Sequence, residues 1–147
     1  MMHSHAEIRI EAPVDHVWAL FSDTSRWEDW MPARFSEFSG PVEEVGTTFV
    51  QTVRVMGFEQ KMTVTIVEFE PLRLYHDHVE PGPFDSYFRC EPDGDATSLA
   101  FESDYEIPAK LPGFVKRVVT SGWIERNHRK MLADFKALAE ATAPVHV

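Results

Sequence analysis

The chain has 147 residues, 14 of them basic and 24 acidic, which gives a formal net charge of −10 at pH 7. This length suits a single domain of about 100–150 residues, and the excess of negative charge argues against a nucleic-acid binder. A lone cysteine excludes an internal disulfide framework and a cysteine-rich zinc site. Because no apolar run reaches the ~20 residues that cross a bilayer and no hydrophobic segment follows the N-terminus, we expect a cytoplasmic protein without an integral membrane segment.

The N-terminal elements are predicted from two different spacings of apolar residues. Residues 8–12 alternate apolar and charged side chains, which indicates a strand with one exposed face. Residues 14–21 carry apolar side chains at helical spacing and predict a short helix. Thr24 or Ser25 can cap a second short helix, which Pro32 ends.

Strands dominate the middle of the chain, and a helix follows them. Residues 35–105 alternate apolar and polar side chains in about six segments separated by glycine and proline, which predicts antiparallel strands joined by tight turns. Beyond Pro112 and Gly113 there is no proline until Pro144, and apolar residues recur at helical spacing. This pattern predicts one C-terminal helix of about 28 residues. Such a helix must lie on one face of the sheet to bury its apolar stripe.

Six short motifs follow one another in a recognisable order along the chain. They are Ile8-x-Ile10-x-Ala12-Pro13-x-x-x-Val17-Trp18, Phe21-Ser22-Asp23, Arg26-Trp27-x-x-Trp30, Val45-Gly46, Glu70-Pro71-x-Arg73-Leu74 and Gly94-x-x-Thr97. With the terminal helix, they resemble the START-like superfamily, and most of all its polyketide cyclase/dehydrase branch (SRPBCC, Bet v 1-like).

The resemblance implies one START-like domain over residues 1–147 with an α+β helix-grip fold. In that fold a curved antiparallel sheet wraps around a long C-terminal helix, and two short helices follow the first strand. A ligand cavity is expected between sheet and helix. Members of the superfamily bind lipids, sterols, polyketides and hormones, and only some are enzymes, so the fold locates a site without defining a reaction.

The expected cavity wall is aromatic and aliphatic, as is usual for small-molecule sites. Trp27 and Trp30 either plug one end of the sheet as core, or Trp30 forms a movable entrance with Met31 and Phe35. The residues predicted to bind the ligand are Trp30, Phe35, Phe58, Met62, Val64, Leu74, Ser86, Phe88, Leu99, Phe101, Val119, Gly122 and Trp123.

Two histidines on one predicted strand are the candidate acid or base groups. If Leu72 and Leu74 face inward, then so do His76, His78 and Glu80, because strand side chains alternate. The histidines would then lie at the pocket rim and, with Tyr105, handle protons; alternatively, both lie on the outer surface. Three such side chains on one strand rarely complete a metal shell alone and the resemblance implies no metal site, so we expect neither metal nor cofactor.

Gly122 is unusual because glycine inside a helix costs about 1 kcal/mol relative to alanine. Either the predicted helix passes very close to a strand at this point, or the missing side chain leaves room for a ligand beside Trp123 and Val119. The sequence alone keeps both interpretations open.

Three functions remain compatible with these features. The first is binding of a small hydrophobic molecule that is lipid-, polyketide- or aromatic-like. The second is a polyketide cyclase/aromatase or dehydratase that uses the same pocket with histidine acid/base residues. The third is a partner-binding or stress-response domain whose cavity is incidental. Common signatures of hydrolases, nucleotide sites and metalloproteases are absent from the sequence.

Overall fold

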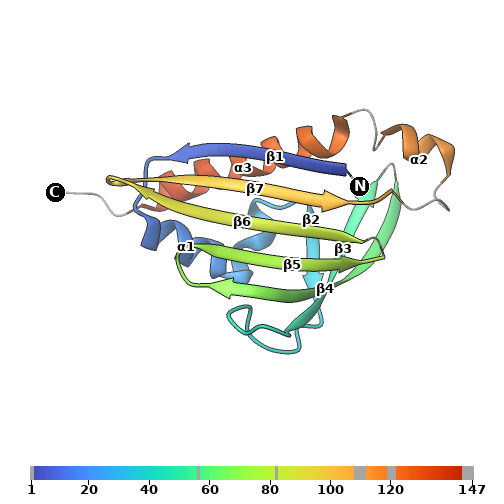
Figure 1. Ribbon diagram of the computed structural model, residues 1–147, viewed down its shortest axis with the longest axis horizontal. Coiled ribbons are helices and arrows are strands. Elements are labelled where there is room, and N and C mark those ends of the chain that lie inside the picture. Colours follow the sequence, from blue (N-terminus) through green and yellow to red (C-terminus); the bar gives the residue numbers. More distant parts are fainter. Residues whose placement is uncertain (1, 56, 82, 108–111, 119–121, 144–147) are drawn as a thin grey trace.

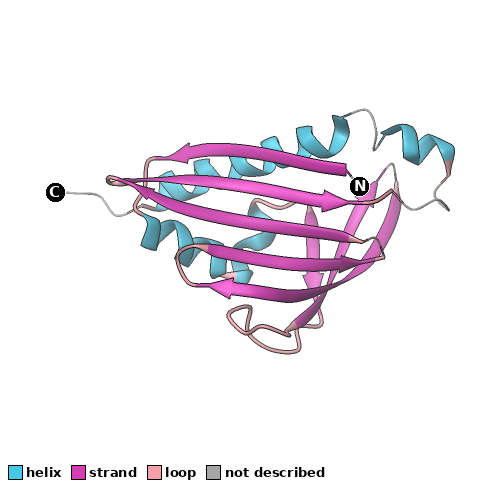
Figure 2. Cartoon of the chain, viewed as in Figure 1, coloured by secondary structure: helices cyan, strands magenta, loops and turns pink. Residues whose placement is uncertain are grey.

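The computed structural model describes residues 2–55, 57–81, 83–107, 112–118 and 122–143. They form a seven-stranded antiparallel sheet with helices against one face (Figures 1 and 2). The chain order is one strand, two short helices, six strands and then C-terminal helices. This arrangement confirms the predicted helix-grip fold.

The sheet has the strand order β1-β7-β6-β5-β4-β3-β2, so the first strand pairs with the last and the other strands follow in sequence. The strands are β1 (Met2–Ile10), β2 (Ala33–Ser36), β3 (Thr48–Val55), β4 (Phe58–Glu70), β5 (Leu74–Glu80), β6 (Phe84–Asp93) and β7 (Ala96–Tyr105). The helices are α1 (Val14–Ser22), the 3-10 helix η1 (Thr24–Asp29), α2 (Gly113–Val118) and α3 (Ile124–Thr142).

The sheet is curved, and β4 carries much of the bend. Its pairing with β5 shifts register between Ile66 and Glu68. An extra residue on one strand bends that strand and increases its twist. Figure 1 shows β4 curving so that its first half lies beside β3 and its second half beside β5. The face that this bend encloses is called the concave face below, and the opposite one the convex face.

The short helices close one end of the concave face with aromatic side chains. The Asp23 side chain, rather than Thr24 or Ser25, caps η1 by accepting a hydrogen bond from the Ser25 backbone N–H at 3.1 Å. Trp27 and Trp30 are both 2% exposed, so the interpretation as core is correct. The ring of Trp30 lies 4.8 Å from that of Phe135, which joins this end of the sheet to α3.

The C-terminal segment differs from the single long helix that the sequence predicts. Its described residues include the helices α2 and α3, and the 19 residues of α3 begin at Ile124, two positions after Gly122, whose φ is 87°. A left-handed residue cannot continue a regular right-handed helix. None of the helices in the described part of the chain combines the length and hydrophobicity that a membrane crossing needs. Helix α3 buries Ile124, Met131, Leu132, Phe135 and Ala139.

Candidate functional site

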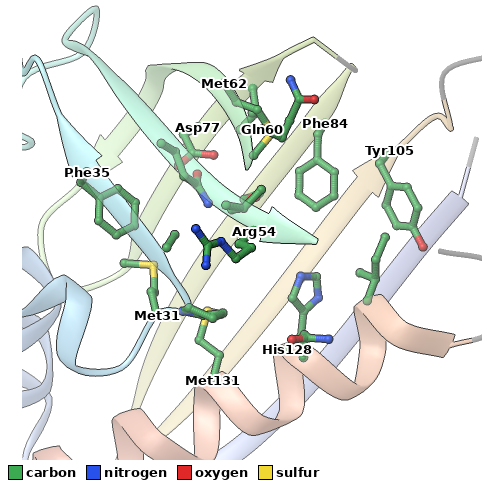
Figure 3. Close-up of a pocket in the computed structure, with 18 of the residues that line it drawn as sticks. Met31, Phe35, Arg54, Gln60, Met62, Asp77, Phe84, Tyr105, His128 and Met131 are labelled. Atoms are coloured by element: carbon green, nitrogen blue, oxygen red, sulfur yellow. The ribbon is translucent and has the colours of Figure 1, made fainter. Parts of the chain in front are cut away.

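A cavity of about 610 Å³ lies between the concave face, the short helices and α3. Strands β3 to β7 supply its walls because alternate residues of each point to the concave face. Figure 3 shows the His128 and Met131 side chains pointing from α3 toward side chains of the sheet. The volume is within the range of about 300–1,000 Å³ that is typical of small-molecule sites.

Aromatic rings make the deep end of the cavity apolar. Phe88 on β6 stacks on Phe21 of α1 with 4.4 Å between ring centroids, and it meets Phe101 of β7 edge-on at 5.0 Å. Trp27 meets Phe35 edge-on at 5.0 Å. All five side chains line the cavity. Rigid rings packed in this way present a fixed apolar surface to a ligand.

The mouth of the cavity lies beside the β3–β4 turn and α2. Phe58 and Phe114 line the cavity but are 64% and 45% exposed, with ring centroids 6.2 Å apart. Arg54 is paired at 3.5 Å with Glu59, and both side chains line the same opening. A ligand would therefore pass two exposed rings and an ion pair on its way in.

Asp77 on β5 places a carboxyl group in the apolar wall. The Tyr75 hydroxyl donates a hydrogen bond to its Oδ2 at 2.7 Å, and the side chain is only 8% exposed. Burial raises the pKa of Asp77 to about 7, although the Tyr75 hydrogen bond and the nearby His76 and His78 oppose this shift. Burial also raises the pKa of Tyr75, which therefore keeps its proton. The pair thus holds a carboxyl whose charge changes near neutral pH.

A second polar group enters the cavity from α3. His128 lies edge-on to Phe101 at 4.5 Å, and burial lowers its pKa to about 4, so the imidazole is neutral at physiological pH. Tyr105 stacks on Phe84 at 5.2 Å, and burial, with Glu125 nearby, raises the pKa of its hydroxyl. Within the described chain, the Tyr105 hydroxyl has no hydrogen-bond partner. Both groups can donate or accept a hydrogen bond without carrying charge.

The structure divides the predicted site residues into two groups. Their role in binding stays a prediction, but their positions are clear. Those that line the cavity are Phe35, Phe58, Met62, Ser86, Phe88, Phe101, Tyr105 and Trp123. Those described residues that lie outside its lining are Trp30, Val64, Leu74, Leu99 and Gly122, while Val119 lies outside the described residues.

The inward orientation predicted for His76 and His78 is wrong, because both lie on the convex face. His76 Nδ1 lies 2.9 Å from Glu68 Oε1 and its Nε2 lies 2.9 Å from Asp85 Oδ1. His78 Nε2 lies 2.8 Å from Glu80 Oε1. These histidines bind surface carboxylates and lie away from the cavity. No group of three potential ligands in the described part of the chain is placed to hold a metal ion.

The error arises from the two leucines that set the expected alternation. Leu72 has a left-handed backbone, with φ 68°, in the turn before β5 and is 42% exposed. Leu74 is half-buried on the convex face, where it lies opposite Arg89. The buried Tyr75 and Val79 define the true inward alternation.

The sequence pattern alone did not place Asp77, Tyr75 or His128 in the cavity. Asp77 lies midway between Tyr75 and Val79, so an alternation anchored on those two apolar residues would have placed it inward. His128 carries a weaker signal, because its position on α3 follows the helical stripe that includes Met131.

Gly122 has a different explanation from either one that the sequence left open. Its φ of 87° is a conformation that residues with a side chain rarely adopt. An added Cβ would meet the Arg126 and Glu125 side chains in the first turn of α3, and no described strand lies closer. Gly122 therefore provides the left-handed backbone conformation that precedes the start of α3.

The family model described as "Polyketide cyclase / dehydrase and lipid transport" matches residues 1–140. The comparison with curated proteins gives no match.

Several solved structures share the fold at low sequence identity. A protein of Thermus thermophilus has a TM-score of 0.80 and 16% identity, over 97% of this chain and 100% of its own. The Zhui aromatase/cyclase of Streptomyces sp. R1128 has a TM-score of 0.76 and 20% identity, over 97% and 99%. Norcoclaurine synthase of Thalictrum flavum, in complex with dopamine and hydroxybenzaldehyde, has a TM-score of 0.69 and 17% identity, over 98% and 89%. These likenesses concern the fold, and the family match over residues 1–140 places the chain in the polyketide cyclase/dehydrase and lipid transport family.

Proposed function

We propose that this protein binds a small hydrophobic molecule, lipid-, polyketide- or aromatic-like, in the cavity between the sheet and α3. The observation that carries the proposal is the cavity of about 610 Å³ with its predominantly apolar and aromatic lining. Water in its deep end meets few hydrogen-bond partners, so replacing that water with an apolar ligand is favourable. The structural relatives named as an aromatase/cyclase and as a synthase in complex with two aromatic molecules support an aromatic ligand.

The test is a fluorescence titration with the neutral apolar probe N-phenyl-1-naphthylamine. Ser86 lines the cavity, so Ser86→Leu fills part of it and is expected to weaken probe binding at least tenfold. Ser98→Leu is the matched control, because Ser98 lies on the opposite face of the neighbouring strand β7, and it should leave affinity unchanged. Equal affinity of both variants and the wild type would contradict the proposal. Mass spectrometry of an organic extract of the purified protein then identifies a natural ligand.

An enzyme of the cyclase/aromatase or dehydratase type is the second candidate. It is favoured by one observation: Asp77 has a pKa of about 7 inside the cavity, which suits proton transfer at neutral pH. The histidines that the sequence suggested for this role lie on the other face of the sheet, so Asp77 and His128 replace them beside Tyr105, which the sequence also suggested. Incubation with a linear poly-β-ketone, followed by the absorbance of an aromatic product, tests it. Turnover that is lost in Asp77→Asn supports an enzyme, and the absence of any turnover opposes it.

A further inference from the structure

A row of small polar residues crosses the concave face in register. Asp77 on β5 lies opposite Ser86 on β6, which in turn lies opposite Ser103 on β7. Ser103 lies opposite Ser4 on β1, and Ser4 Oγ approaches His128 Nδ1 on α3 at 3.4 Å. Both ends of this row reach the cavity, since Asp77, Ser86 and His128 line it. A cavity with a predominantly apolar lining therefore has a polar strip across its sheet wall.

At the Asp77 end of the row, one carboxyl oxygen forms no hydrogen bond with the described residues. Tyr75 donates to Oδ2, but Oδ1 of Asp77 has no hydrogen-bond partner among the described residues and is buried. An acceptor that is buried in an apolar site without a hydrogen bond is costly. A donor supplied from the cavity would remove that cost.

The described residues of the cavity provide no cation for Asp77. Arg54 and His128 are the only positively chargeable side chains among those that line it. The Arg54 side chain is 69% exposed and pairs with Glu59 at the mouth. His128 is neutral near pH 7, because burial lowers its pKa to about 4. Since no described residue, charged or neutral, donates a hydrogen bond to Oδ1, a ligand can supply the donor that completes Asp77.

We propose that the ligand of this cavity is an apolar molecule carrying a hydrogen-bond donor, either a hydroxyl or an ammonium group, and that Asp77 is the residue that recognises it. This inference rests on the proposed binding function. Tyr75 orients the carboxyl through its hydrogen bond to Oδ2, and Ser86 lies beside the same position on the next strand. The specificity of the site thus comes from one carboxyl group in an aromatic wall.

The two donor types make different demands on the charge of Asp77. Burial, together with the charge of Asp85, raises its pKa, while Tyr75, His76 and His78 lower it, with a result of about 7. An ammonium group requires the ionised carboxylate, so its affinity should rise about tenfold between pH 6 and pH 8. A hydroxyl accepts from the protonated acid or donates to the carboxylate, so its affinity should change little with pH.

Three probes of similar size test the inference by isothermal titration calorimetry. They are 1-ethylnaphthalene, 1-naphthalenemethanol and 1-naphthylmethylamine, and the measured quantity is the affinity of each polar probe relative to the apolar one. Asp77→Leu removes every hydrogen bond at this position and should lower that ratio at least fivefold for the preferred polar probe. Asp77→Asn keeps the shape of the side chain and distinguishes the two donor types. It should lower the ratio at least tenfold for an ammonium ligand and leave the ratio for a hydroxyl ligand unchanged.

Asp104→Asn is the matched control, because Asp104 lies on the convex face of β7, where it pairs with His3. It should leave both ratios within twofold of the wild type. Ratios that stay within twofold in Asp77→Leu and Asp77→Asn would overturn this inference while leaving the binding function intact. A wild type that binds 1-ethylnaphthalene but neither polar probe would also overturn this inference and leave the binding function intact. A wild-type protein that binds none of the three would overturn the binding function as well.

Discussion

The imidazole of His128 meets the ring of Phe101 edge-on with 4.5 Å between their centroids. This contact joins α3 to the middle of β7 inside the cavity wall. It also keeps the imidazole away from water, which lowers its pKa from 6.5 to about 4. A polar group of the site is therefore also a determinant of stability.

Acid should destabilise the fold through His128. Between pH 6.5 and pH 4 the unfolded chain binds a proton at this residue and the folded chain does not, so the free energy of unfolding falls as pH falls. At about 1.4 kcal/mol per pH unit the loss is roughly 3 kcal/mol. His128→Gln, which does not titrate, should remove that slope in urea unfolding measured across this range. If the free energy of unfolding of the variant differs from that of the wild type by the same amount at pH 4 and at pH 6.5, the prediction is wrong.

Asp77 should have the opposite effect on stability from His128, because it should raise the free energy of unfolding as the pH falls. Its folded pKa of about 7 lies above its ordinary value of 3.8, so the unfolded chain releases the proton first as pH rises. The free energy of unfolding therefore declines between pH 4 and pH 7, by up to roughly 4 kcal/mol at about 1.4 kcal/mol per unit. The stability of Asp77→Asn relative to the wild type should increase by that amount over the same interval. Guanidinium unfolding at pH 4 and pH 8 measures it, and a constant difference speaks against a buried, protonated Asp77.

Gly122→Ala should destabilise the protein by about 1–2 kcal/mol, because a Cβ is disfavoured in the left-handed region. Gly113 offers the matched control: it starts α2, its φ is not positive and nothing described lies within 4 Å of an added Cβ. Gly113→Ala should be neutral or stabilise by about 0.4–1 kcal/mol. Thermal unfolding followed by circular dichroism compares the two. Equal effects at both glycines would rule out the conformational explanation.

Replacing both His76 and His78 by alanine should leave the affinity for N-phenyl-1-naphthylamine within twofold of the wild type. The two side chains contact Glu68, Glu80 and Asp85 on the convex face and do not line the cavity. Loss of these partly buried contacts should cost stability on the order of 1 kcal/mol. A tenfold weaker affinity in a folded double variant would show that the histidines contribute to ligand binding.

Local pattern was sufficient to predict most of the strands and helices of this protein, and the family resemblance supplied the way they assemble. Period-two alternation over residues 35–105 and helical spacing near both ends specified the strands and helices, because each element must bury one apolar face. The same patterns placed Phe88, Phe101 and Ser86 on the concave face. The family resemblance then located a cavity beneath the C-terminal helix.

The tertiary structure alone decided which face of β5 lines that cavity. A shift of one residue reverses every side chain of a strand, and Leu74 and Tyr75 are both apolar, so the sequence allowed either orientation. The pairing of β5 between β4 and β6 turned Asp77 inward and His76 outward. Burial then gave Asp77 its unusual pKa, which depends on neighbours distant in the sequence and on the exclusion of water.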